Sequence, residues 1–383
     1  MIITLFFFIF ISNSLSENIH FKDRCLWVVR YSLDSKSSID KMLGFAVQHN
    51  FNHIFVQVRG RGDSLYRSSW IPRSEVLSDD YFDPLEYVIK EGHRLKLNIH
   101  AWVNVYMLWS AENHPDNEHH LFNRHPDWLD AVEEESQKYL YTHKRSHTDA
   151  SGKEGFYLAP HHPGVNPYLL AVFKELLNHY ELDGLHLDYV RFKNESHGYN
   201  PIGIEQFRNY FDSENGVNAG DNKTRTNKNS YNEYLIQREE FLCQSVTELV
   251  LKLRSFINNS NKEMIFSAAV KPNIEKAKQL YFQEWDIWLS SGLMDWVLVM
   301  NYDPSFQTFM NNISTFEDRL TQSNFSNIIM GVALYNQSPD VAKKKIKYSY
   351  NAGFTGIALF SYDVMKEQIN KMKPVLSLFS ENE

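Results

Sequence analysis

Apolar and polar side chains alternate through the centre of residues 182–192, Leu-Asp-Gly-Leu-His-Leu-Asp-Tyr-Val-Arg-Phe. A period of two is typical of a β-strand, so His186 and Asp188 share one face and the neighbouring leucines share the other. Apolar residues at helical spacing precede this strand over residues 165–180, and another helical stretch begins at Pro201. The order helix, strand, helix predicts a parallel sheet covered by helices.

Seven further stretches have the length and apolar character of strands, and helical stretches separate them. They are residues 26–31, 53–60, 96–104, 264–271, 295–303, 327–335 and 356–362. Eight strands, each followed by a helix, predict a single closed (β/α)8 barrel, the TIM barrel of the α/β class. An open doubly wound sheet usually carries a glycine-rich phosphate loop after its first strand, and none follows Tyr31.

Two connections are longer than the barrel requires. Residues 105–164, after the third strand, lack clear periodicity and are rich in His, Asp and Pro, and we expect them to form a lid over the carboxyl end of the sheet. The polar residues 212–230, after the fourth strand, are predicted to be a surface insertion. The histidines of the lid segment show no recognisable ligand spacing, so we expect neither a metal nor another cofactor.

The amino-terminal residues predict a signal peptide over residues 1–16. Residues 1–11 form an apolar run too short for a membrane anchor, and Ser14 and Ser16 supply the small residues of a cleavage site. A basic start is missing, and an uncleaved anchor or a buried strand are the alternatives. With cleavage, residues 17–383 form the barrel domain in the secretory pathway or outside the cell, and no later stretch predicts a membrane span.

In a secreted chain, Asn-x-Ser/Thr triplets are candidate glycosylation sites. Six are present, at Asn194, Asn222, Asn258, Asn312, Asn324 and Asn336, and we expect only some to be used. The two cysteines, Cys25 and Cys243, allow at most one disulfide, and two buried thiols are the favoured interpretation.

The formal net charge of -8 argues against a nucleic-acid partner, which requires a basic surface. The 14% content of aromatic residues suits a protein that stacks sugar rings, but it also suits an ordinary core. In a barrel the carboxyl ends of all strands meet at one mouth. The residues at this mouth with functional side chains are Arg59, Arg61, Asp63, His100, Trp102, Asn104, His186, Asp188, Arg191, Lys271, Asn301, Tyr302, Asp303 and Tyr335.

Acids, aromatics and arginines at one mouth suit a carbohydrate, and glycoside hydrolysis needs two carboxyl groups that flank one bond. Asp188 is predicted to be the nucleophile or a stabiliser of the transition state. Asp303 is predicted to be the general acid/base, with its pKa raised by burial beside Tyr302 and Trp102. The remaining residues are expected to belong to the substrate-binding site. Within it, His186 and Arg191 are expected to orient Asp188. The residues expected to contact hydroxyls or acidic groups are Arg59, Asp63, Asn104 and Tyr335.

Structural roles stay open at several of these positions. Asp188 could cap a turn or pair with Arg191, and Asp303 could be a turn residue before Pro304. Further alternatives are that Asp63 braces its loop against Arg59 or Arg61, that Trp102 packs in the core, and that Lys271 is a solvated strand end or binds phosphate or carboxylate.

Residues 56–66, Val-Gln-Val-Arg-Gly-Arg-Gly-Asp-Ser-Leu-Tyr, resemble the glycosyl-hydrolase-like family 10 proteins. Five further motifs resemble the family in order: Phe-Asp-Pro-Leu (82–85), His-Ala-Trp-Val-Asn (100–104), His-Pro-Asp-Trp (125–128), Tyr-Leu-Ala-Pro (157–160) and Asp-Gly-Leu-His-Leu-Asp-Tyr (183–189). The resemblance covers roughly residues 26–362. It implies a (β/α)8 barrel and a glycoside hydrolase activity.

The chain has a weaker resemblance to chitinase-like family 18 glycosidases. Their fourth-strand signature begins Asp-Gly and ends in a catalytic Glu, and their sixth strand carries Met-x-Tyr-Asp. Asp183-Gly184, Asp188 and residues 300–303 match these patterns, but Val190 stands at the position of the Glu. The chitinase mechanism is therefore not carried over.

We therefore predict a secreted glycoside hydrolase that acts on a poly- or oligosaccharide. The missing Glu keeps a second interpretation open, a catalytically degenerate carbohydrate-binding protein on the same barrel. A third is hydrolysis of a non-glycosidic bond in a glycan-containing polymer, because a fold does not determine its chemistry.

Overall fold

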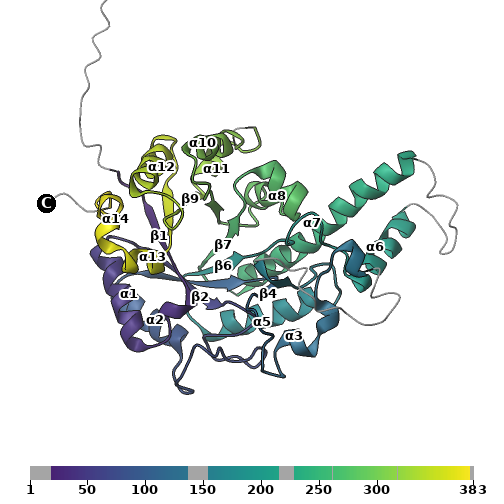
Figure 1. Cartoon of the computed structure of the whole chain (residues 1–383), viewed down its shortest axis with the longest axis horizontal. Coiled ribbons are helices and arrows are strands. Elements are labelled where there is room, and N and C mark those ends of the chain that lie inside the picture. Colours follow the sequence, from purple (N-terminus) through teal and green to yellow (C-terminus); the bar gives the residue numbers. More distant parts are fainter. Residues whose placement is uncertain (1–18, 137–153, 215–227, 261, 317, 380–383) are drawn as a thin grey trace, which may run out of the picture.

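Eight parallel strands close into a barrel in the computed structural model (Figure 1). The strands are β1 (Asp23–Val28), β2 (His53–Arg59), β3 (Asn98–Asn104), β6 (Gly184–Asp188), β7 (Ile265–Val270), β8 (Trp296–Met300), β9 (Ile328–Ala333) and β10 (Gly356–Phe360). Neighbours in the barrel follow one another along the chain, and β10 closes the ring against β1. The predicted TIM barrel is confirmed. The structure describes residues 19–136, 154–214, 228–260, 262–316 and 318–379.

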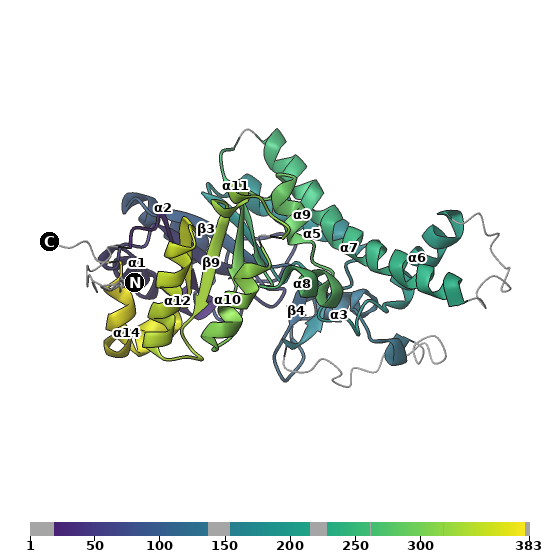
Figure 2. The same ribbon diagram turned by 90° about the horizontal axis from the view of Figure 1, so that it is seen from above.

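Helices surround the barrel, as Figure 2 shows from above. They are α1 (Lys36–Gln48), α2 (Pro84–Arg94), α5 (Val165–His179), α6 (Pro201–Glu214), α7 (Lys228–Asn259), α8 (Ile274–Tyr281), α9 (Trp285–Ser290), α10 (Phe306–Ser314), α11 (Gln322–Phe325), α12 (Pro339–Asn351), α13 (Tyr362–Glu367) and α14 (Ile369–Leu376). The start of α2 shows how the sequence sets a helix boundary: the Asp83 carboxylate caps it by accepting the Glu86 N–H at 3.0 Å, and Pro84 is its first residue.

The long connection after β3 contains more regular structure than its sequence predicts. Strands β4 (Met107–Trp109) and β5 (Phe156–Tyr157) pair antiparallel, and a short helix, α3 (Leu121–Arg124), lies between them in the chain. Strands of two or three residues are too short to show an alternation of apolar and polar side chains, so the sequence did not predict them. This two-stranded β4–β5 sheet begins close to the barrel: two residues before β4, the Val105 N–H donates to the Asp188 carbonyl at 2.8 Å.

The predicted insertion after β6 is partly helical. Its ends belong to α6 and to α7, which project beyond the barrel in both views (Figures 1 and 2). Residues 215–227 of the insertion, residues 137–153 of the expected lid, the predicted signal peptide and the Asn222 sequon lie outside the described residues. No helix among the described residues is long and apolar enough to cross a membrane.

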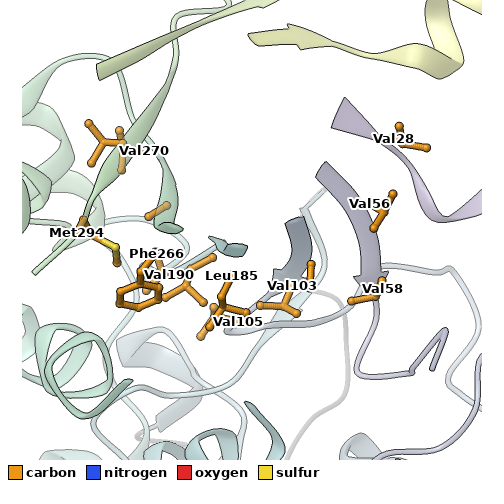
Figure 3. Close-up of a cluster of buried hydrophobic side chains, with 14 of the residues drawn as sticks. Val28, Val56, Val58, Val103, Val105, Leu185, Val190, Phe266, Val270 and Met294 are labelled. Atoms are coloured by element: carbon orange, nitrogen blue, oxygen red, sulfur yellow. The ribbon is translucent and has the colours of Figure 1, made fainter. Parts of the chain in front are cut away.

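The alternation along each strand divides the core into two layers. Outward side chains such as Val56, Val103 and Leu185 pack beneath the helices, and Figure 3 shows them on neighbouring strands. Inward side chains form a separate aromatic cluster that includes Trp27 and Trp102. The interior also holds buried histidines, so the apolar layer that stabilises the fold lies mainly outside the barrel.

Both cysteines are buried free thiols, which confirms the favoured interpretation. Among the described sequons, Asn258 and Asn336 are exposed, and Asn194, Asn312 and Asn324 are partly buried. The Asn312 amide donates to the Asn301 side-chain oxygen at 2.9 Å. Glycosylation at Asn312 would disturb this contact, so Asn258 is the better glycosylation candidate.

We expect Leu185→Ala to lower the free energy of unfolding by about 2–5 kcal/mol, because the substitution leaves a cavity in a fully buried layer. Urea unfolding followed by circular dichroism measures the change. Leu251→Ala is the matched control: the same atoms are removed from a side chain that is 48% exposed, and the shift should stay below about 0.5 kcal/mol. Equal shifts in both variants would contradict the two-layer description of the core.

Candidate active site

A cavity of about 500 Å³ opens at the carboxyl end of the barrel. This size is within the range of small-ligand pockets. Seven of the barrel strands contribute residues to its wall, the loop after β9 contributes Tyr335, and the segments around β4 and β5 add one side. The lining residues are Trp27, Val29, Arg30, Tyr31, Gln57, Arg61, Trp102, Asn104, Met107, Ser110, Glu154, Asp188, Tyr189, Arg191, Ala269, Lys271, Met300, Tyr302, Tyr335 and Phe360.

Asp188 lies in this wall at the end of β6, with 8% of its surface exposed. The Trp102 indole N–H donates to its Oδ2 atom at 3.2 Å, and the Tyr189 backbone N–H donates to Oδ1 at 2.7 Å. Burial raises the pKa of Asp188 to about 6, although these two donors, Arg191 and Lys271 all favour the ionised form. A carboxyl group in this environment can exchange a proton near neutral pH.

Glu154 is the second carboxylate of the cavity, and it stands two residues before β5. Its Oε2 atom accepts from the Arg191 guanidinium at 3.2 Å and from the Tyr157 hydroxyl at 2.9 Å. Burial raises the pKa of Glu154, but Arg191, Lys271 and the hydrogen bonds outweigh it, and the pKa is lowered overall. Glu154 is therefore ionised where Asp188 is still protonated.

Lys271 follows β7 and its Nζ atom lies 4.4 Å from the centre of the Tyr281 ring. Burial and the nearby Arg191 lower the pKa of Lys271 to about 8, while Glu154 and Asp188 act in the opposite direction. Both carboxylates thus share the same two cations, Arg191 and Lys271, within one cavity.

The structure brings eight of the fourteen sequence-predicted residues into the cavity wall. These are Arg61, Trp102, Asn104, Asp188, Arg191, Lys271, Tyr302 and Tyr335. Trp102 packs in the inner aromatic cluster, as the alternative of core packing predicted, and its indole N–H also reaches Asp188.

Arg59, His100 and His186 are buried and lie outside the cavity wall. Arg59 donates to the carbonyls of Asn104 and Val105, so it holds the end of β3. The His100 ring lies 4.3 Å from the Phe55 ring, centre to centre, deep inside the barrel.

His186 contacts residues other than Asp188. It accepts from the Trp27 indole at 3.3 Å, and its Nδ1 atom lies 2.9 Å from the Ser267 hydroxyl. Burial lowers the pKa of His186 to about 3, so the ring is neutral. The expectation that His186 orients Asp188 directly is wrong.

The remaining three residues have structural contacts. Asp63 accepts the Arg61 backbone N–H at 2.9 Å and the Ser74 hydroxyl, so it braces its own loop without forming the expected ion pair. Asn301 is buried and donates to the Phe309 carbonyl at 2.9 Å.

Asp303 is exposed and accepts the Ser305 backbone N–H at 2.8 Å, as the alternative of a turn residue predicted. Its expected burial beside Tyr302 and Trp102 is wrong. The sequence placed Asp303 at the end of a strand over residues 295–303, but β8 already ends at Met300.

Glu154 was not predicted from the sequence, because the candidate acids were taken only from strand ends. Glu154 stands in a segment without clear period, and the available signal was the short apolar run Phe156-Tyr157-Leu158 behind it. Trp27 was missed because the first strand reads as uniformly apolar, which conceals which residues face inward.

The family model for glycosyl hydrolase-like 10 matches residues 16–349. The chain belongs to the glycosyl hydrolase-like 10 family. This confirms the resemblance seen in six motifs and makes the coarse function that of a glycoside hydrolase-like protein.

Two relatives of this family member carry the name glycosyl hydrolase. YngK of Bacillus subtilis is 29% identical over 167 residues, which cover 40% of this chain and 28% of YngK. DigH of Escherichia coli K12 is 26% identical over 186 residues, 47% of this chain and 40% of DigH. The aligned region is thus less than half the length of either relative.

Solved structures similar to this glycosyl hydrolase-like 10 protein share its fold. The catalytic domain of the Paenibacillus polymyxa β-amylase superposes with a TM-score of 0.59 at 10% identity, covering 94% of this chain and 99% of that one. The Geobacillus stearothermophilus α-galactosidase AgaA gives 0.52 at 13% identity, covering 94% and 42%. Both are TIM-barrel glycosidases.

Asp188→Asn should stabilise the protein more at pH 8 than at pH 4. In the wild type the folded-state pKa is about 6 and the unfolded-state pKa about 4, so the folded state loses stability as pH rises between these values. The stability difference between variant and wild type should therefore increase by about 3 kcal/mol from pH 4 to pH 8. Urea unfolding at both pH values measures it, and a difference independent of pH would contradict the raised pKa.

Proposed function

We propose that this protein is a secreted glycoside hydrolase that cleaves a poly- or oligosaccharide with Asp188 and Glu154. The observation that carries the proposal is the pair of carboxyl groups in one cavity, with pKa values displaced in opposite directions. Two carboxyl groups in different protonation states are what hydrolysis of a glycosidic bond requires.

Asp188 is the general acid/base in this proposal, because its raised pKa keeps it protonated where Glu154 is ionised. It protonates the leaving oxygen of the glycosidic bond. Glu154, held by Arg191, stabilises the positive charge that develops on the sugar ring, or attacks it. This assignment reverses the role expected for Asp188 and replaces Asp303 by Glu154.

Exposed aromatic rings at the mouth supply surfaces for sugar stacking. Tyr31 is 53% exposed after β1, and Tyr335 is 57% exposed after β9. The Tyr335 ring stands edge-on to the Tyr302 ring at 6.5 Å, which holds it upright at the rim. Exposed aromatic rings beside a polar cavity suit the apolar faces of sugars.

A second candidate function is carbohydrate binding without catalysis. It is favoured by one observation: the strand position that carries a Glu in chitinase-like enzymes is Val190, and this residue is fully buried. Glu154 would then serve recognition together with Arg191.

Purified protein screened against polysaccharides and aryl glycosides should show turnover on at least one substrate class. On that substrate Asp188→Asn and Glu154→Gln should each reduce kcat by about 10²–10⁴-fold, the usual contribution of general acid–base catalysis. Circular dichroism checks that the variants fold.

Asp303→Asn is the matched control, since it removes the same charge from an exposed turn, and it should keep activity within about twofold of the wild type. Loss of activity in Asp303→Asn alone would restore Asp303 as the general acid/base. Binding without turnover, equal in all four proteins, would favour the second candidate function.

The pH dependence of kcat/KM should have its alkaline limb near pH 6. The general acid must be protonated, so activity falls as pH rises through the pKa of Asp188, and it falls at low pH as Glu154 becomes protonated. Stopped assays across pH 3–9 measure the profile. An activity that keeps rising above pH 7 would exclude Asp188 as the acid.

A further inference from the structure

The catalytic cavity continues into a second pocket of about 220 Å³. Arg30, Tyr31 and Arg61 line both, so they form the boundary between them. The second pocket is bounded on its far side by Trp109 and His120 from the segment after β3. A ligand that extends from the cavity into the second pocket passes the two arginines.

Neither arginine at this boundary has a carboxylate partner among the described residues. The Arg30 guanidinium donates to the Tyr31 hydroxyl at 3.0 Å, and the Arg61 Nε atom donates to the Ser110 hydroxyl at 3.0 Å. By contrast, Arg191 in the same cavity is paired with Glu154 at 3.2 Å. A guanidinium has five N–H donors, so both boundary arginines keep donors for a ligand.

The site is built to hold these charges together. Arg30 is only 6% exposed, and a Cβ atom at Gly60 would lie 2.2 Å from its Nη1 atom, so only glycine leaves room for this guanidinium. Arg61 lies against the Trp109 ring, 5.7 Å from its centre. Burial and then repulsion from Arg30 lower the pKa of Arg61, while Tyr31 and Asp63 act in the opposite direction. Holding like charges together is unfavourable unless an anion joins them.

The charge of the cavity differs from that of the chain. Four basic and two acidic side chains line the cavity, although the chain carries a formal net charge of -8. The excess positive charge is therefore local to the mouth. It attracts anionic groups to this place against the field of the rest of the protein.

We propose that Arg30 and Arg61 form an oxyanion subsite that selects carbohydrates carrying a carboxylate or a sulfate ester next to the bond at Asp188. The proposal rests on the proposed function only in taking a carbohydrate as the ligand. A planar guanidinium binds both oxyanions through paired, charge-assisted hydrogen bonds. The sugar that carries the oxyanion would stack on Tyr31, whose ring lies beside Arg30.

Binding of Asp188→Asn to a glycan array with uronic-acid, sulfated and neutral oligosaccharides tests the subsite without turnover. We expect acidic members to bind at least about tenfold more tightly than neutral members of the same length, and the preference to weaken as salt rises from 0.05 to 0.5 M. The uronic-acid and sulfated arms identify which oxyanion is preferred. Equal binding of acidic and neutral members would overturn the proposal.

Arg61→Gln, in the same Asp188→Asn background, should reduce binding of the acidic members about tenfold and leave neutral members unchanged, while Arg61→Lys should keep part of the preference. Arg94→Gln is the matched control, because it removes the same charge from an exposed position on α2. A loss shared by acidic and neutral members, or by Arg94→Gln, would also overturn the proposal.

Failure of the subsite and failure of the proposed function give different results. An acid preference that depends on Arg61, without turnover in the wild type, keeps the subsite and rejects the hydrolase. Turnover in the wild type, with acidic members bound no more tightly than neutral ones and with Arg61→Gln changing neither, rejects the subsite and keeps the hydrolase.

Discussion

The burial of the Asp188 carboxyl group is the constraint on which the site depends. The alternation of β6 directs this side chain into a barrel interior filled with aromatic rings. Among the residues that the structure describes, only Trp102 and one backbone N–H donate to it. Ionisation is costly there, so the pKa is raised to about 6. The apolar layer outside the barrel supplies the stability that offsets this cost.

The second carboxylate is held by a different part of the chain. Glu154 lies beside the β4–β5 sheet, two residues before β5, and it forms an ion pair with Arg191 from the loop after β6. The same cation thereby keeps Glu154 ionised, while burial keeps Asp188 protonated. The barrel and the β4–β5 sheet together create the difference in pKa between the two acids that acid–base chemistry needs.

The fold was predictable from sequence because each strand is a short apolar stretch, and eight such stretches with helices between them admit few arrangements. Asp188, Trp102 and Lys271 followed directly, since each stands within or just after a strand whose inner face could be read. Asp303 failed because the strand ends before it. Glu154 was missed because its position depends on a two-residue strand and a pairing across 47 residues, neither of which a local pattern reveals.

The most direct test of this account is a titration of the Asp188 carboxyl group by carbon-13 NMR, with Asp188→Asn used to assign its signal. The account predicts a midpoint near pH 6, about two units above an ordinary aspartate. A midpoint at or below pH 4 would mean that the carboxyl is solvated or ion-paired, and the division of roles between Asp188 and Glu154 would then be wrong.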